Sequence, residues 1–268
     1  MNYHKVLTIA GSDSGGGAGV QADIKTISAC GCYASSVITA VTVQNTIGVE
    51  AVHPVPTEIV EAQIRAVMSD IGADVVKIGM LHSSEIIETI AATLANYKVQ
   101  HLVLDPVMVS TSGHRLIEES AIDTLCRVLI PCATVITPNI PEAEILLGHA
   151  IHSQSDMTEA AKALGDKYQV SVLLKAGHLV ERELVDYLYC HTDNTILPLS
   201  SVRLDTPNTH GTGCTLSSAL ASFLARGFSL KEACSAAKNY ISAAISAGAD
   251  YEIGHGHGPV HHFHAYWK

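Results

Sequence analysis

The strongest constraint on the fold is a repeated alternation of short apolar runs with longer amphipathic segments. Runs rich in Val, Ile and Leu predict buried strands, and apolar residues spaced three or four apart predict helices. The predicted strands cover residues 5–11, 33–43, 74–80, 101–107, 134–137 and 171–176. The predicted helices cover residues 18–30, 57–71, 83–97, 118–129, 141–147, 157–168, 212–226 and 230–249. This order predicts a mostly parallel central sheet with helices on both faces, a three-layer α/β/α sandwich.

Two segments depart from the alternation. Residues 184–204 predict a pair of strands with Asp193-Asn194 at the turn. Residues 254–268 are rich in glycine and histidine and predict a loop. No linker, internal repeat or low-complexity tract divides the chain, so we expect one domain over residues 1–268.

Composition narrows the possible partners. Charged residues make up 16% of the chain and the net charge is −10, whereas soluble domains have about 25% charged residues. Because no basic run exists, we expect neither a nucleic-acid groove nor a membrane surface. An anionic substrate then has to be held by backbone N–H groups or by a metal. The chain begins without a signal-peptide pattern and has seven scattered cysteines, which predicts reduced thiols and a cytoplasmic location.

A glycine-rich segment, GSDSGGGAG, occupies residues 11–19 between the first predicted strand and helix. Such a loop turns tightly and lets a ligand approach the backbone. A dinucleotide-binding loop needs an acidic residue about 20 residues further on, but none lies between Asp23 and Glu50. The segment therefore argues against a nucleotide-dependent oxidoreductase. A purely structural turn remains the alternative.

A second glycine-containing segment, THGTGCT, occupies residues 209–215 directly before an apolar helix. Backbone N–H groups at such a helix start form an anion hole, which suits charge developing on a transferred phosphoryl group. Cys214 falls in the first turn, where the helix dipole is expected to lower the thiol pKa toward neutrality. A thiolate there could accept a hydroxyl proton. A glycine N-cap with a buried cysteine is the alternative.

Polar residues follow three more of the predicted strands. Asp105 and Glu142, with the amide of Asn139, could hold Mg²⁺ and its waters at one edge of the sheet. Helix capping by Asn139 and Glu142 is the alternative. Gln44 could read the edge of a heterocycle, although Gln44-Asn45-Thr46 is also a turn signal.

The histidines near the end of the chain invite a metal interpretation. They are His255, His257, His261, His262 and His264. Because no cysteine or acidic residue stands at a recognised spacing from them, we expect a solvated or loop-packing role instead.

Taken in order, the motifs resemble one family over nearly the whole chain, from about residue 5 to residue 260. The motifs are GSDSGGGAGVQADIKT (11–26), TAVTVQNT (39–46), VVKIGML (75–81), VLDPVMVS (103–110), VITPNIPEAEIL (135–146), LLKAGH (173–178) and DTPNTHGTGCTLSSA (205–219). The chain resembles the hydroxymethylpyrimidine/phosphomethylpyrimidine kinases of thiamine biosynthesis, a branch of the ribokinase-like superfamily. The resemblance implies that MgATP phosphorylates 4-amino-5-hydroxymethyl-2-methylpyrimidine and then its monophosphate. It also implies a homodimer.

The resemblance also implies the site residues, position by position. The anion hole is formed by Gly211, Thr212 and Gly213, and Cys214 stands where sugar kinases of the superfamily carry an aspartate base. The pyrimidine pocket is lined by Gln44, Asp23, Gly11, Met80 and Val107. The metal and phosphates lie near Asp105 and Glu142, and the nucleotide lies near Asn139, Lys175 and Lys238.

Two other functions remain open from the sequence. A pyridoxine/pyridoxal kinase shares the cysteine-bearing loop in one branch of the superfamily, and Gln44 favours the pyrimidine over that vitamin. A binding protein that kept a kinase fold without turnover is the other alternative, and the intact GTGC, Asp105 and Glu142 argue against it.

Overall fold

The computed structural model describes residues 2–108, 116–177 and 182–267. In these ranges the strands form one nine-stranded sheet in the order β3-β2-β1-β4-β5-β6-β7-β8-β9. The strands are β1 (Lys5–Asp13), β2 (Tyr33–Gln44), β3 (Val49–Pro54), β4 (Val75–Ile78), β5 (His101–Leu104), β6 (Val135–Ile136), β7 (Ser171–Leu174), β8 (Glu183–Cys190) and β9 (Thr195–Val202).

The centre of the sheet is parallel and its two edges are antiparallel. Strands β2, β1, β4, β5, β6 and β7 pair parallel with their neighbours. The pairs β2–β3, β7–β8 and β8–β9 are antiparallel. The chain runs from β1 to β2 on one side and later to β4 on the other, so the order reverses at β1. Ligands of open α/β sheets bind beyond the carboxyl ends of strands at such a reversal.

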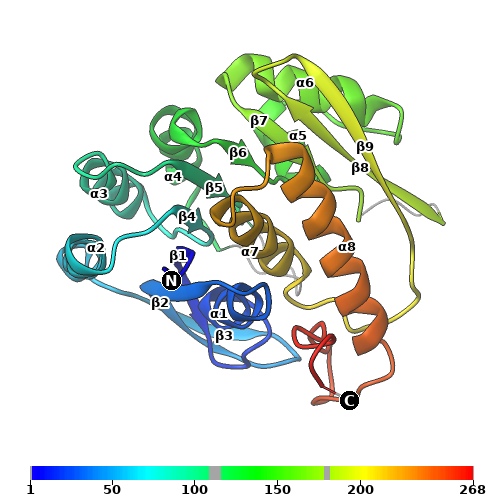
Figure 1. Ribbon diagram of the computed structural model, residues 1–268, viewed down its shortest axis with the longest axis horizontal. Helices are drawn as coiled ribbons and strands as arrows, with labels where there is room; N and C mark the ends of the chain where they lie inside the picture. The colour runs from blue at the N-terminus through cyan, green and yellow to red at the C-terminus, as the bar shows by residue number, and fades with distance from the viewer. Residues whose placement is uncertain (1, 109–115, 178–181, 268) are drawn as a thin grey trace.

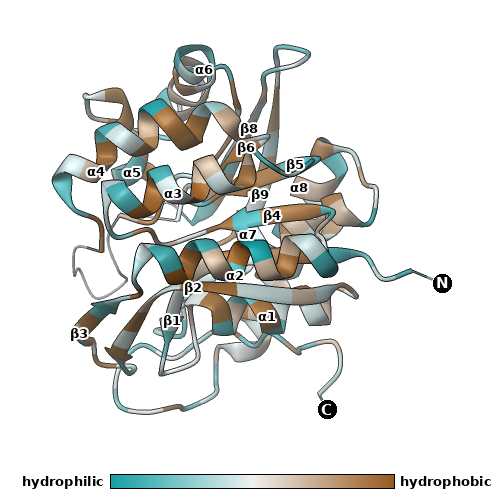
Figure 2. Ribbon diagram, turned by 90° about the vertical axis from the view of Figure 1, so that its left-hand side faces the viewer, coloured by the Kyte–Doolittle hydropathy of each residue, from teal (hydrophilic) through white to brown (hydrophobic). Residues whose placement is uncertain are grey.

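Helices cover both faces of the sheet (Figure 1). One face carries α2 (Thr57–Asp70), α3 (Ser84–Leu94), α4 (Glu119–Thr124), α5 (Ile140–Leu147) and α6 (Asp156–Tyr168). The other carries α1 (Gly19–Ala29), α7 (Thr212–Ala225) and α8 (Leu230–Gly248). Figure 2 shows apolar and polar residues alternating along α2 and α3, as amphipathic helices require. The expected three-layer α/β/α sandwich is confirmed.

Side chains on the central strands alternate between the two faces. On β4, Val76 and Ile78 join the core beneath α2 and α3, whereas Val75 joins the core beneath α7 and α8. Lys77 lies two residues after Val75 and so faces α1 and α7. Asp105, two residues after Val103 on β5, faces the same side. Charged side chains are thus buried on the face that α7 covers.

The structure adds details that the sequence pattern did not predict. The edge strand β3 was not expected, because it is short and only Val49 of it is buried. The helix expected over 118–129 changes into a π-helical turn at Leu125–Leu129 and then a 3₁₀ turn at Ile130–Cys132. The predicted strand pair is confirmed as β8 and β9, with Asn194 in the left-handed conformation at its turn.

The histidine-rich tail forms a loop that packs against the domain. His262 is buried and lies 3.2 Å from the hydroxyl of Thr215, and burial lowers its pKa to about 4. In the part of the chain that the structure describes, no group of three or more His, Cys, Asp or Glu side chains could hold a metal, and no helix is long and apolar enough to cross a membrane.

Candidate active site

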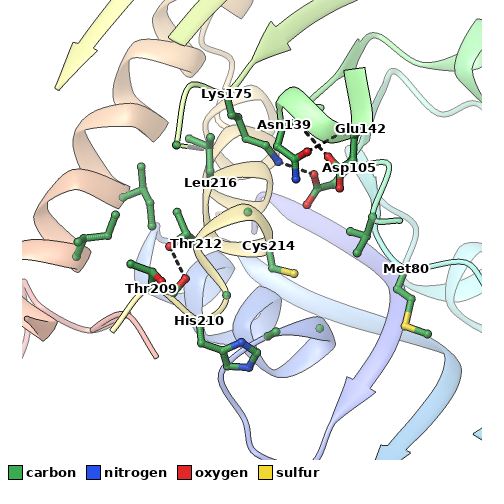
Figure 3. A pocket seen from close by; sticks show the side chains of 18 of the residues that line it. Met80, Asp105, Asn139, Glu142, Lys175, Thr209, His210, Thr212, Cys214 and Leu216 are labelled. Carbon is green, nitrogen blue, oxygen red and sulfur yellow. Dashed lines mark hydrogen bonds and ion pairs between the residues drawn. The ribbon is translucent and has the colours of Figure 1, made fainter. Parts of the chain in front are cut away.

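A cavity of about 810 Å³ opens beyond the carboxyl ends of the central strands. This volume suits a small-molecule site. Most of the residues expected at the site line it (Figure 3). They are Gly11, Gln44, Met80, Asp105, Val107, Asn139, Glu142, Lys175, Gly211, Thr212, Gly213, Cys214 and Lys238. The motif residues 109–110 and 178, and the last residue of the tail, lie outside the described residues.

The strand order arranges these residues along the sheet edge. Gln44 ends β2, Met80 follows β4 and Asp105 follows β5. Asn139 follows β6 and Lys175 follows β7. Because neighbouring strands lie about 4.8 Å apart and β1, β4, β5 and β6 separate β2 from β7, Gln44 and Lys175 are well separated along the cavity wall. The start of α7, which carries Cys214, lies beside Lys175 and Asp105 (Figure 3).

The end of the cavity near β1 and β2 is lined by small and uncharged residues together with Asp13 and His210. A Cβ added to Gly11 would stand 2.9 Å from the sulfur of Met80, so this glycine makes room in the wall. Gln44 is half-buried there, with its amide between Thr42 and His210. Such a pocket can hold a flat ring and read its edge with one amide.

The start of α7 can serve as the expected anion hole, although Thr212 does not contribute its N–H to it. Gly211 adopts φ +78° as the N-cap. The N–H and hydroxyl of Thr212 both donate to the carbonyl of Thr209, so Thr212 serves the loop itself. The N–H groups of Gly211, Gly213 and Cys214 have no hydrogen-bond partner among the described residues. These three N–H groups, at the positive end of the helix dipole, are the ones available to an anion.

The expected low pKa of Cys214 is wrong. The thiol is in the first turn of α7, as predicted, and points into the cavity on the side of Met80 and Asp105 (Figure 3). Burial raises its pKa to about 11, although the nearby Lys77 ammonium acts in the opposite direction. The loss of hydration affects the thiol pKa more than the positive end of the helix dipole does. The thiol is therefore protonated at neutral pH while the cavity holds no ligand.

Asp105 and Lys175 form a buried ion pair in the cavity wall. The ammonium of Lys175 lies 3.0 Å from Oδ1 of Asp105, which also accepts from Thr137. Burial alone would lower the pKa of Lys175, but the carboxylates of Asp105 and Glu142 raise it above its ordinary value. Lys175 is therefore a fixed cation in the cavity wall, five strands along the sheet from Gln44.

Asn139 and Glu142 form a capping box at the start of α5, which confirms the capping interpretation. The Asn139 side chain accepts from the N–H of Glu142, and the Glu142 carboxyl accepts from the N–H of Asn139. Both residues also line the cavity. Burial raises the pKa of Glu142 to about 7; Lys175 opposes this shift and Asp105 adds to it. A cation bound beside Glu142 would favour its ionised form.

Lys238 lies at the cavity wall on α8, but it is not a free cation. Its ammonium donates to Asp186 of β8 at 2.7 Å, and both side chains are buried. Asp186 also accepts from the N–H of Ala176, just beyond β7. The pair fixes α8 against the antiparallel edge of the sheet.

The expectation that Asp23 lines the pyrimidine pocket is wrong. Asp23 is fully buried and does not line the cavity. Both of its carboxylate oxygens lie 2.9 Å from the ammonium of Lys77, and it accepts from the hydroxyls of Thr8 and Ser218. Thus Asp23 lies beneath the site, where it joins α1 to β1, β4 and α7.

Three residues were missed by the sequence reading. Lys77 stands in an apolar strand and is separated from Asp23 by 54 residues, so no local pattern linked them. Asp13 and His210 pair across 197 residues at 2.9 Å and both line the cavity. Asp13 could have been found, because an Asp before Ser and three glycines signals a side chain that accepts from its own loop.

Comparison with known proteins places this geometry in a family. The model for phosphomethylpyrimidine kinase matches residues 13–261, which include every lining residue discussed above except Gly11. The chain belongs to the phosphomethylpyrimidine kinase family. The resemblance drawn from the motifs is confirmed.

Relatives in this family match the chain from end to end. A protein of Rhizobium meliloti named hydroxymethylpyrimidine/phosphomethylpyrimidine kinase is 51% identical over 263 residues, covering 98% of each chain. The crystal structure of phosphomethylpyrimidine kinase from Clostridium difficile is 46% identical with a TM-score of 0.79, covering 90% of this chain and 99% of that one. An ADP complex of Bacillus subtilis pyridoxal kinase is 38% identical with a TM-score of 0.89, covering 97% and 98%.

Proposed function

We propose that this protein transfers phosphoryl groups from ATP to 4-amino-5-hydroxymethyl-2-methylpyrimidine and then to the resulting monophosphate. The observation that carries the proposal is one cavity that joins a pocket beside Gln44 to the open N–H groups at the start of α7. The fixed cation Lys175 lies beyond the hole. Family membership and the names of the relatives support the same reaction.

The first transfer needs little covalent participation by the protein. The hydroxymethyl oxygen bonds to the γ-phosphorus, the bond to the bridging oxygen breaks, and ADP leaves with that electron pair. The N–H groups of Gly211, Gly213 and Cys214 are fixed before the reaction begins and would stabilise the charge on the transferred group. The hydroxyl proton must also leave. The thiolate of Cys214 is the proposed acceptor, which requires charges in the loaded cavity to lower the pKa of this thiol.

The nucleotide is proposed to lie toward Lys175, Asn139 and Lys238. A net charge of −10 repels a triphosphate, so local groups have to supply the attraction. Lys175 is such a group. The ADP complex of the Bacillus subtilis relative supports nucleotide binding on this fold.

The residues present fit a magnesium ion held jointly with phosphates. Asp105 and Glu142 face one another closely enough for Asp105 to raise the pKa of Glu142. Mg²⁺ is usually bound by one or two carboxylates together with waters and substrate phosphates. We assign it to this carboxylate pair, where it would neutralise phosphate charge.

A parallel assay tests the proposed acceptor. Purified protein with MgATP is given the hydroxymethylpyrimidine in one reaction and pyridoxine in another, and ADP release is measured against substrate concentration. We expect the pyrimidine to give the higher kcat/KM. Turnover of pyridoxine alone would assign the protein to the second candidate, a pyridoxal kinase, which the Bacillus subtilis structure brings into consideration. Absence of turnover in both would leave only binding.

Four further properties belong to the proposal. We propose one kinase domain, because no linker or repeat divides the chain, and a cytoplasmic location, because its seven cysteines are scattered as reduced thiols would be. We propose no nucleic-acid partner, because the sequence has no basic run. We also propose a homodimer. Sedimentation at several protein concentrations tests the dimer, and a monomer at micromolar concentration would contradict it.

A further inference from the structure

Gly17 of the glycine-rich loop lies between Asp13 and the start of α7. Its N–H donates to Oδ2 of Asp13 at 3.0 Å, as does the N–H of Ala18 at 2.8 Å. A Cβ at Gly17 would stand 2.3 Å from Cδ2 of His210, and a Cβ at Gly211 would stand 1.8 Å from the carbonyl oxygen of Gly17. The loop therefore packs directly on the two residues that lead into α7, His210 and Gly211.

The side chains of Asp13 and His210 join this loop to the start of the helix. Nε2 of His210 lies 2.9 Å from Oδ2 of Asp13, and both side chains are largely buried. Burial alone would raise the pKa of Asp13, but hydrogen bonds from His210 and Ala18 hold it below its ordinary value. Because an ionised carboxylate only accepts hydrogen bonds, the hydrogen on Nε2 of His210 is directed to Asp13. The imidazole is thus held in place against Gly17.

The peptide plane between His210 and Gly211 is held by a second contact. Its carbonyl oxygen, which belongs to His210, accepts from the N–H of Val260 at 3.3 Å. In a trans peptide the C=O and N–H groups point in opposite directions, so the N–H of Gly211 points away from Val260. Gly211 lines the cavity, and its N–H has no partner among the described residues. It is the first of the three open N–H groups at the start of α7.

The direction of this N–H matters because an anion hole lowers a barrier only when its donors already point to where charge develops. Gly211 adopts φ +78°, and glycine is the residue that moves most readily between backbone conformations. Without contacts on both sides, the peptide before Gly211 is free to rotate and turn its N–H away from a phosphoryl group. Val260 supplies the contact on one side, and the pair of Asp13 and His210 supplies it on the other.

We propose that Asp13 and His210 are positioning residues for both phosphoryl transfers. Their pair holds the glycine-rich loop against the start of α7 and so fixes the direction of the Gly211 N–H toward the transferred group. The two side chains act through this backbone group and not on the reacting atoms. The inference rests on the proposed function for its reaction, whereas the contacts between the loop and α7 do not depend on it.

Single-turnover rates of the two transfers test the proposal. We expect His210→Ala to slow the transfer to the alcohol and the transfer to the monophosphate equally, by about tenfold, which is less than the roughly 100-fold cost of deleting a donor outright. The KM values for ATP and for the pyrimidine should stay within about twofold, as for a contact that acts only in the transition state. A rise in KM without a loss of rate, or a loss confined to one transfer, would overturn the inference.

Two further histidine variants separate this contact from general effects of substitution. His210→Gln places an amide nitrogen as many bonds from the backbone as Nε2, so it can still donate to Asp13 and should regain most of the lost rate. His255→Ala removes an exposed imidazole from the same tail and should leave both rates unchanged. A His210→Gln variant that unfolds at the wild-type temperature but is as slow as His210→Ala would contradict the proposal.

A double-mutant cycle tests whether Asp13 acts through His210. Asp13→Ala should slow both transfers at least as much as His210→Ala, because it also leaves the loop N–H groups without their acceptor. The double variant should then be little slower than Asp13→Ala alone. Two losses that simply multiply would show that the residues act separately and would overturn the joint role. If Asp13→Ala does not fold, the His210 variants decide the proposal.

Amide hydrogen exchange tests the contact in the protein without any ligand. In His210→Ala the N–H groups of Gly17 and Ala18 should exchange about three- to tenfold faster than in the wild type, the size of one hydrogen bond, while those of α8 keep their rates. Unchanged exchange at Gly17 and Ala18 would overturn the inference. If the wild type phosphorylates neither the alcohol nor the monophosphate, the proposed function fails, and the exchange rates still decide whether the pair holds the loop against α7.

Discussion

At the scale of single residues, the charges beneath and around the cavity occur in pairs. Asp23 holds Lys77, Asp105 holds Lys175, and each pair joins distant strands and helices. Breaking a buried pair leaves a charge without compensation, which is worse than replacing both members. The pairs therefore make the cavity wall sensitive to single substitutions.

Replacing Lys77 tests this sensitivity. Lys77→Met leaves Asp23 buried and unpaired, so we expect the free energy of unfolding in urea to fall by about 3–5 kcal/mol. Asp23→Asn added to Lys77→Met removes the stranded charge and keeps one acceptor oxygen for the hydroxyl of Thr8 or Ser218, while the other hydroxyl can accept from the amide nitrogen. We expect this double variant to regain at least half of the loss. A single variant within 1 kcal/mol of the wild type would show that the pair is not stabilising in the way described.

Cys214 gives a prediction about the two transfers. The alcohol of the first substrate must lose a proton, whereas a phosphate acceptor is already anionic near neutral pH, with a second pKa of about 6. We expect Cys214→Ala to slow the first transfer by about 100-fold, within the range of general base catalysis, and the second by much less. Equal losses in both steps would contradict a role as base.

The pH dependence of the first transfer gives a second test of Cys214. Because burial raises its pKa to about 11, the reactive thiolate is scarce at neutral pH and becomes more abundant as pH rises. The rate should therefore increase from pH 6 to pH 9 in the wild type and stay nearly flat in Cys214→Ala. A flat wild-type profile would mean that the thiolate is not the base.

At the scale of elements, the starts of helices hold residues proposed for catalysis, and some of these residues lower the stability of the fold. Glu142 is buried at the start of α5 with a pKa raised to about 7. The unfolded chain binds fewer protons than the folded one between about pH 4.5 and 7, so stability falls as pH rises through this window.

Glu142→Gln measures the contribution of this carboxyl to the pH dependence of stability, because glutamine can keep the capping box with Asn139. Relative to the variant, the wild type should lose up to about 3 kcal/mol of unfolding free energy between pH 5 and 8. Urea unfolding at each pH without nucleotide or Mg²⁺ provides the comparison. Parallel pH profiles for the two proteins would rule out the proposed protonation of Glu142.

The N-cap of α7 depends on close contact with the glycine-rich loop. A Cβ at Gly211 would stand 1.8 Å from the carbonyl oxygen of Gly17, at a φ of +78°. Gly227, just beyond the other end of α7, has φ +87° but open space around it. We expect Gly227→Ala to cost about 1–2 kcal/mol for conformation alone and Gly211→Ala to cost clearly more. Equal costs in urea unfolding would show that the loop yields to the extra methyl group.

The sequence predicted the helices and strands well where buried apolar residues recur at a regular spacing. The central strands and the helices α1, α3, α7 and α8 lie within a few residues of their predicted bounds. β3 was missed because an exposed edge strand has no apolar period. Asp23 was misplaced and Lys77 was overlooked for a different reason: their positions depend on partners far away in the sequence.

At the scale of the whole molecule, the order of the strands in the sheet separates two binding tasks. The residues proposed to read the ring follow β1, β2 and β4, and those proposed to hold phosphates follow β5, β6 and β7, with α7 between them. A product monophosphate can then return to the same pocket and present its phosphate to the same anion hole. The account therefore requires both transfers to occur in one cavity.

Time-resolved mass spectrometry of the wild-type protein with MgATP and the hydroxymethylpyrimidine tests this requirement most directly. The account predicts that the monophosphate rises first and then declines as the diphosphate accumulates, and that added monophosphate slows the first step by competing for the pocket. A monophosphate that persists unchanged, or no phosphorylated pyrimidine at all, would contradict it.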